Sequence, residues 1–294
     1  MLNQIFKSMP QEPVDAVHDY VKEREQNQKR KPVKKPKGIT LEIVDFGGVD
    51  GEIIKPKNPD PKKVIWFIHG GGCTTGSALE SRGCTYYLAE KFGYTIISNN
   101  YRLSPENKWP AQLDDCMVVY DRITALGYDM SRVILMGGSA GAWLVLSFAL
   151  RARDEKKVMP KGICAFSPLT NQADDLPSHH GNEKTDYMLK DMLYRPGQNI
   201  AVFGEAIPPR AVMTDPYVSP YFGDYQGLPP VYLAVSSSEV LYDDATTLYE
   251  KLKAEGHPVE IEIVDGICHA YATLPMMPEA RKTLKKGIDF VENQ

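Results

Sequence analysis

Short apolar runs alternate with longer helix-forming segments along most of the chain from residue 39 onward. Residues 64–68 are apolar at every position, which is expected of a strand buried on both faces of a sheet. Similar strands are expected at residues 94–98, 133–136, 162–166, 231–235 and 259–264. Helices are expected between or after several of them, at residues 79–92, 111–126, 140–153, 243–255 and 276–292. This alternation predicts a mostly parallel sheet with right-handed crossovers.

The region before these runs has a different pattern. Residues 39–46 and 51–55 alternate between apolar and polar side chains, which predicts half-buried strands. Residues 1–38 are polar, with a helix-like part at residues 13–29 and a basic run with two prolines at residues 29–37. We interpret the basic run as a solvated linker, with a nucleic-acid patch or a targeting signal as the alternatives.

The alternation also stops between Pro168 and Pro216. This segment is polar, contains scattered helix formers and lacks an apolar run. It is long for a connecting loop, so we expect it to contain short helices of its own. Because it follows the end of a strand, we interpret it as a lid over a site.

Composition narrows the classes of function. A chain of 294 residues suits one large domain, with or without a small accessory piece. Its net charge of −4 gives no large basic field for nucleic acid or an anionic membrane. We expect neither a signal peptide nor a membrane span. The five cysteines have no C-x-x-C spacing, so we interpret them as reduced thiols of a cytoplasmic protein, with a secreted form as the alternative.

A candidate nucleophile lies where a strand is expected to turn into a helix. Residues 137–141 read Gly-Gly-Ser-Ala-Gly, and G-x-S-x-G in this setting is typical of a nucleophile elbow. The glycines allow the tight turn, and Ser139 would project at the carboxyl end of the sheet, where open α/β sheets bind ligands. The positive end of the helix would favour developing negative charge. The alternative is a structural glycine-rich turn.

A second glycine-rich segment could stabilise that charge. Residues 69–72 read His-Gly-Gly-Gly and follow the expected strand 64–68. Acyl transfer builds negative charge on the carbonyl oxygen, and unobstructed backbone N–H groups can bind it. We assign the donors to Gly71, Gly72 and Ala140. A phosphate-binding loop is disfavoured, because no Lys-Ser or Lys-Thr follows.

The serine also needs a base and an acid, which follow it in the order acid, histidine in chains with this type of elbow. His269 comes just after the last expected strand and is our candidate base. His257 lies in a turn before that strand, and His179 and His180 lie in the lid, where we expect them to be solvated.

The acid should follow the strand expected at residues 231–235. Glu239, Asp243 and Asp244 are all available there. Asp243 and Asp244 suit the N-terminus of the next helix, where a carboxylate can cap free N–H groups. Glu239 is therefore the stronger candidate.

From about Lys62 to the C-terminus, the sequence resembles the hormone-sensitive-lipase family of α/β-hydrolases, in its bacterial esterase branch. The resemblance rests on blocks in the family's order: residues 69–72 (HGGG), 101–106 (YRLSPE), 109–115 (WPAQLDD), 137–141 (GGSAG), 219–221 (SPY) and 228–230 (LPP). The chain has Gly138 where the family usually has Asp, and Ala142-Trp143 where a second glycine is common. Glu239 stands at the first Asp of the family's D-x-L-x-D motif.

The resemblance implies an α/β-hydrolase fold, with a mostly parallel eight-stranded sheet flanked by helices and a small helical cap. The core would comprise residues 39–170 and 214–294, and the cap residues 1–38 and 171–213. It further implies hydrolysis of small-molecule esters with small acyl groups, without a metal or other cofactor. A homodimer is a further possibility. Cys73, Trp143 and the cap are expected to line the pocket.

Three functions therefore compete. In an esterase, Ser139 attacks the ester carbonyl, His269 transfers the proton, and Glu239 orients His269. A binding protein on the same fold can lack one of these residues, and here all three are present. An acyltransferase, or a hydrolase of amides or lactones, would use the same triad.

Overall fold

The computed structural model describes residues 19–29, 31–189, 198–204 and 208–294. Eight strands form one sheet in the order β1-β2-β4-β3-β5-β6-β7-β8. Only β2 is antiparallel, to both β1 and β4, and all other pairs are parallel. The predicted mostly parallel eight-stranded sheet is therefore confirmed. The strands are β1 (Thr40–Asp45), β2 (Asp50–Lys55), β3 (Val64–Ile68), β4 (Thr95–Asn99), β5 (Val133–Gly138), β6 (Gly162–Phe166), β7 (Val231–Ser236) and β8 (Val259–Val264).

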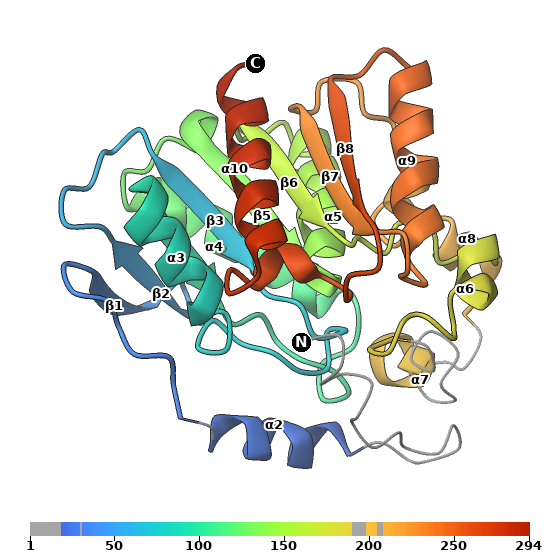
Figure 1. Cartoon of the computed structure of the whole chain (residues 1–294), viewed down its shortest axis with the longest axis horizontal. Coiled ribbons are helices and arrows are strands. Elements are labelled where there is room, and N and C mark those ends of the chain that lie inside the picture. Colours follow the sequence, from blue (N-terminus) through green and yellow to red (C-terminus); the bar gives the residue numbers. More distant parts are fainter. Residues whose placement is uncertain (1–18, 30, 190–197, 205–207) are drawn as a thin grey trace.

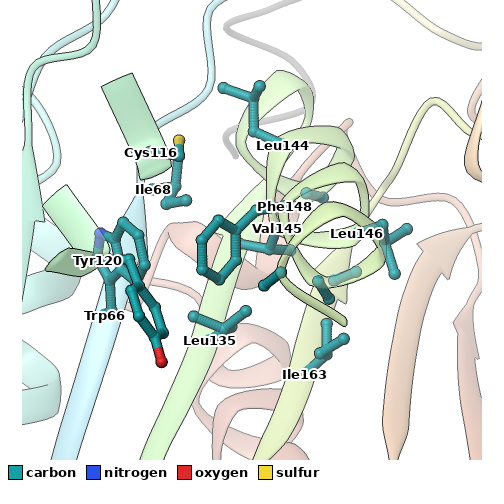
Figure 2. Close-up of a cluster of buried hydrophobic side chains, with 14 of the residues drawn as sticks. Trp66, Ile68, Cys116, Tyr120, Leu135, Leu144, Val145, Leu146, Phe148 and Ile163 are labelled. Carbon is teal, nitrogen blue, oxygen red and sulfur yellow. The ribbon is translucent and has the colours of Figure 1, made fainter. Parts of the chain in front are cut away.

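Helices cover both faces of the sheet (Figure 1). One face packs against α4 (Ala111–Ala125), α5 (Ala140–Asp154) and α9 (Tyr242–Ala254), and the other against α3 (Arg82–Phe92) and α10 (Pro278–Glu292). Figure 2 shows part of the first interface, where Phe148 of α5 meets the edge of the Trp66 ring with 4.9 Å between centroids. Apolar side chains on both faces of β3 to β7 explain why these strands read as continuous hydrophobic runs.

The expected alternation of the first two strands is only partly correct. Four consecutive residues of β2, from Gly51 to Ile54, are buried, whereas β1 is largely exposed. The reason is position: β1 is the edge strand, and β2 lies between β1 and β4. Glu52 of β2 is buried despite its charge because Arg82 of α3 pairs with it at 2.7 Å.

Short elements lie outside the sheet and its helices. The N-terminal helix α2 (Tyr20–Gln28) is followed by residues 31–37, which have no regular structure and are mostly exposed, as expected of a linker. The predicted short helices of the lid segment are α6 (Pro177–Gly181), α7 (Gln198–Phe203) and α8 (Arg210–Met213). Three single turns of 3-10 helix complete the described elements: η1 (Met130–Arg132), η2 (Pro220–Phe222) and η3 (Tyr271–Thr273).

Candidate active site

Ser139 lies between the end of β5 and the start of α5, as predicted. Its backbone has φ 56° and ψ −126°, a conformation that few non-glycine residues adopt. The neighbouring chain leaves no room for side chains beside it. A Cβ atom on Gly137 would lie 2.4 Å from the carbonyl oxygen of Gly141, and a Cβ on Gly141 would lie 2.1 Å from that of Ile68. The two outer glycines of the motif are therefore required by close backbone approach.

The side chains of the predicted acid and base contact each other. Nδ1 of His269 lies 2.6 Å from Oε2 of Glu239, and both side chains are buried. Because a carboxylate can only accept, Nδ1 carries the proton and Nε2 of the neutral ring carries the lone pair. Nε2 is buried and has no hydrogen-bond partner among the described residues. His269 can therefore accept a proton at Nε2.

Glu239 is held by two further donors. Its Oε1 accepts the backbone N–H of Ser236 and the hydroxyl of Ser167, each at 2.8 Å. Ser167 Oγ in turn accepts the N–H of Ala270 at 3.1 Å, next to His269. Ser167 follows the last residue of β6 and has φ 50°. Sequence reasoning did not identify this residue, because no motif marks a serine that bridges two distant loops.

Burial and the carboxylate act in opposite directions on His269. Burial lowers the pKa of the imidazole, but the charge and hydrogen bond of Glu239, together with the charge of Asp186, outweigh it and raise the pKa above its ordinary value. The imidazolium that forms when His269 takes a proton is thus stabilised by its surroundings.

Ser139 and His269 line the same cavity of about 940 Å³. The glycines of residues 70–72 and Trp143 also line it. Cys73 does not, contrary to our prediction: it is fully buried in the hydrophobic core, and burial raises the pKa of its thiol to about 12. The cavity volume of about 940 Å³ is in the range of pockets that bind small organic molecules.

The glycine loop is tightly folded beside the serine. Gly71 and Gly72 have φ 105° and 60°, and a Cβ on Gly71 would lie 2.3 Å from the carbonyl oxygen of Thr75. The carbonyl of Gly71 accepts the N–H groups of Thr74 and Thr75. In the described part of the chain, no hydrogen bond uses the N–H of Gly71, Gly72 or Ala140 as donor.

Comparison with known proteins agrees with this geometry. Residues 65–273 match the family model described as the alpha/beta hydrolase fold. The chain belongs to the α/β-hydrolase family. An esterase of Acinetobacter venetianus is 30% identical to it over 258 residues, which cover 87% of this chain and 83% of the relative. An acetyl-hydrolase of Streptomyces hygroscopicus is 29% identical over 251 residues, covering 85% and 82%.

Similarity to solved structures shows which branch of this family the chain belongs to. EstE5, in a crystal soaked with p-nitrophenyl butyrate, superposes with a TM-score of 0.87 at 27% identity, covering 99% of this chain and 96% of EstE5. EstE7, a homologue of hormone-sensitive lipase from a metagenome library, gives a TM-score of 0.84 at 28% identity, covering 99% and 97%. This α/β-hydrolase is a carboxylic ester hydrolase of the bacterial hormone-sensitive-lipase branch, and the binding-protein alternative is not supported.

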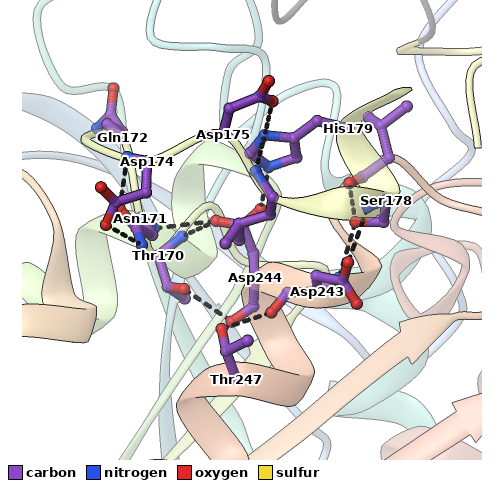
Figure 3. Close-up of polar contacts among 12 residues, drawn as sticks. Thr170, Asn171, Gln172, Asp174, Asp175, Ser178, His179, Asp243, Asp244 and Thr247 are labelled. Atoms are coloured by element: carbon purple, nitrogen blue, oxygen red, sulfur yellow. Dashed lines mark hydrogen bonds and ion pairs between the residues drawn. The ribbon is translucent and has the colours of Figure 1, made fainter. Parts of the chain in front are cut away.

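The two other acid candidates of this hydrolase do not cap α9. The residue before the helix is Leu241, and both aspartates lie in the first turn. Their carboxylates instead bind the lid segment (Figure 3). Asp243 accepts the N–H of Ser178 at 2.7 Å, and Asp244 accepts the N–H groups of Thr170 and Asn171 at 2.8 and 2.9 Å. The helix-capping prediction was wrong, because backbone N–H groups of the lid segment donate to these two carboxylates instead.

The remaining histidines have other partners. His179 is buried rather than solvated, contrary to our prediction, and its Nε2 lies 2.7 Å from the second oxygen of Asp244. His180 is exposed, as expected. His257 Nε2 contacts the carbonyl oxygen of Pro229 at 3.0 Å in a turn. His69 is buried and stacked on Tyr101, and burial lowers its pKa to about 4.

Two features are absent from the described residues. Within residues 19–29, 31–189, 198–204 and 208–294, no group of three or more His, Cys, Asp or Glu side chains could hold a metal ion. In that same portion of the hydrolase, no helix is both long and apolar enough to cross a membrane.

The Asp244 network predicts a difference in stability between two neighbouring carboxylates. Asp244→Ala leaves three buried donors without an acceptor and should lower the free energy of unfolding by about 3 kcal/mol. Asp243→Asn keeps an acceptor oxygen for Ser178 and should cost about 1 kcal/mol or less. Urea unfolding of both variants at pH 7 measures this. Equal destabilisation would contradict the role assigned to Asp244.

Proposed function

We propose that this hydrolase is a serine carboxylesterase that cleaves short-chain carboxylic esters through an acyl-enzyme intermediate. The observation that carries the proposal is the buried His269–Glu239 pair. Nε2 of His269 has no partner in the described residues, and His269 lines the same cavity as Ser139. Ser139 attacks the ester carbonyl while His269 Nε2 takes its proton. His269 then protonates the leaving alcohol and activates the water that releases the acid. Glu239 keeps the proton on Nδ1 throughout.

The negative charge of the tetrahedral intermediate needs hydrogen-bond donors that stabilise it. We assign them to the backbone N–H groups of Gly71, Gly72 and Ala140. Support comes from their place beside Ser139 in the cavity wall and from the lack of any other acceptor for them in the described residues. The N-terminus of α5 adds the positive end of a helix dipole to the same place.

The preference for short acyl groups is supported by a rigid wall. Trp143 lies one turn after Ser139, lines the cavity and stacks on Trp109 with 4.7 Å between ring centroids. Its indole N–H donates to the carbonyl oxygen of Val218 at 2.8 Å. The leaving oxygen must face His269, so the acyl group points away from it, towards this wall.

We further propose residues 39–170 and 214–294 as the catalytic core, with residues 1–38 and 171–213 as the cap. Contacts of α2 and α7 with one loop of the core support this division: Arg24 pairs with Glu106, and the N–H of Trp109 donates to Val202 at 2.8 Å. Parts of this cap, residues 1–18, 30, 190–197 and 205–207, lie outside the described residues. A cytoplasmic location is supported by the five free cysteines, and a homodimer stays a prediction.

Ser139→Ala should abolish esterase activity and leave the fold intact, because it removes one oxygen atom at the surface of the cavity. Turnover of p-nitrophenyl butyrate and circular dichroism measure the two effects. A serine-reactive phosphonate should label only the wild type, at Ser139. Full activity in the variant, or labelling of another serine, would refute the assignment.

Glu239→Gln should lower kcat by about 10² to 10⁴, because the amide cannot hold His269 in the same tautomer; the matching change in serine proteases costs roughly 10⁴. Asp243→Asn is the matched control, with the same loss of charge four residues away. Its kcat should stay within about tenfold of wild type. If the control is nearly inactive and Glu239→Gln is not, Asp243 is the acid.

The rate on p-nitrophenyl esters from acetate to dodecanoate should peak at or below about hexanoate, because longer chains meet the Trp143 wall. Measurements of kcat/KM below the critical micelle concentration of each ester test this. A maximum at dodecanoate would show that the acyl group takes another path.

A further inference from the structure

One buried carboxylate of the cap takes no part in the mechanism above. Asp186 is 3% exposed, and no ion pair between described residues includes it. Within the described residues, its oxygens accept only backbone N–H groups: Oδ1 from Met188 and Leu189 at 3.0 and 2.9 Å, and Oδ2 from Val240 at 3.0 Å. Burying a carboxylate costs free energy, which these three donors offset in part.

The partners of Asp186 belong to two different places. Met188 and Leu189 line the cavity that holds Ser139. Val240 directly follows Glu239 in the loop after β7. A single side chain therefore bridges a turn that faces the substrate and the loop that carries the proposed acid.

Neighbouring cap residues fasten the same loop. The side-chain amide of Asn182 donates to the carbonyl oxygens of Ser237 and Glu239 at 3.1 and 2.7 Å. The hydroxyl of Thr185 donates to the carbonyl oxygen of Ser238 at 3.0 Å. Residues 237–240, which we name the acid loop, are thus held from the cap side over their whole length.

We propose that Asp186 is a positioning residue: it links the substrate-facing turn at Met188 and Leu189 to the acid loop, so that the alignment of Glu239 with His269 depends on the cap. The inference rests on the triad proposed above. The charge of Asp186 has a second effect, because with Glu239 it raises the pKa of His269. Burial raises the pKa of Cys268, which precedes His269 in the chain, to about 11 and lowers that of His69 to about 4, so both are neutral near pH 7. The cavity is also lined by the titratable side chains of Glu80, Asp174, Asp175 and His179.

Asp186→Asn tests both effects, because an amide nitrogen cannot accept from an N–H group. With p-nitrophenyl butyrate, kcat should fall by about tenfold to a hundredfold, as the acid loop loses its anchor. Loss of the negative charge should lower the pKa of His269. Since His269 acts in its neutral form, the acid limb of the kcat/KM profile should move to lower pH.

Asp215→Asn is the matched control. Asp215 also accepts the N–H of the residue two positions later, Tyr217, at 2.8 Å, but it is exposed. This variant should keep the kcat and the acid limb of the wild type. In Asp186→Glu the charge remains but the oxygens are displaced, so the acid limb should stay in place while kcat recovers only in part.

Several results would overturn the proposal. The first is a kcat within about twofold of wild type and an unmoved acid limb in Asp186→Asn. A second is loss of the folded state, by circular dichroism, in both Asp186 variants, which would make the residue purely structural. The triad is tested separately: activity in Ser139→Ala would refute the triad, whereas an unchanged Asp186→Asn enzyme refutes only the link to the cap.

Discussion

The parallel pairing of β5, β6 and β7 sets where the reactive groups of this esterase lie. Gly138 pairs with Phe166, and Phe166 pairs with Ala234. The ladder continues one residue further, because the N–H of Ser139 donates to Phe166 at 2.8 Å and the N–H of Ser167 donates to Ala234 at 2.7 Å. Parallel strands end at the same edge of the sheet, so residues far apart in the chain meet there.

Beyond that edge the loops are no longer held by the backbone hydrogen bonds of the sheet. Buried carboxylates hold them instead. Glu239, Asp244 and Asp186 each accept three hydrogen bonds. A buried carboxylate is tolerated only where such donors surround it, so each one fixes the loops that supply them. Glu239 differs from the other two because one of its donors is the ring of His269, the proposed base.

This arrangement joins the sheet to the loops that lie above its edge. The sheet fixes Ser139 and Ser167, whereas Glu239 and His269 lie on loops after β7 and β8. Cap residues Asn182 and Asp186 contact the loop of Glu239 directly. The proposed cap is therefore part of the support for the proposed acid as well as a wall of the cavity.

Much of this could be predicted from the sequence because the signals are local. Runs buried on both faces gave β3 to β7 to within about two residues at each end. The glycines around Ser139 are required by contacts between backbone atoms, which any chain with this turn must make. The prediction that Glu239 and His269 pair followed from their order after the last two strands, and the 2.6 Å contact agrees with it.

The remaining features were decided by tertiary structure. His179 was expected in solvent and is buried against Asp244, and Cys73 was expected in the pocket and lies in the core. Ser167 and Asp186 carry no motif at all. For His179, Ser167 and Asp186 a deciding partner lies 65, 72 and 54 residues away in the chain, and only the folded sheet brings the two together. The sequence by itself thus determined the fold and the three residues of the proposed triad, whereas the side chains that hold Glu239 and His269 in place depend on which loops the folded sheet brings together.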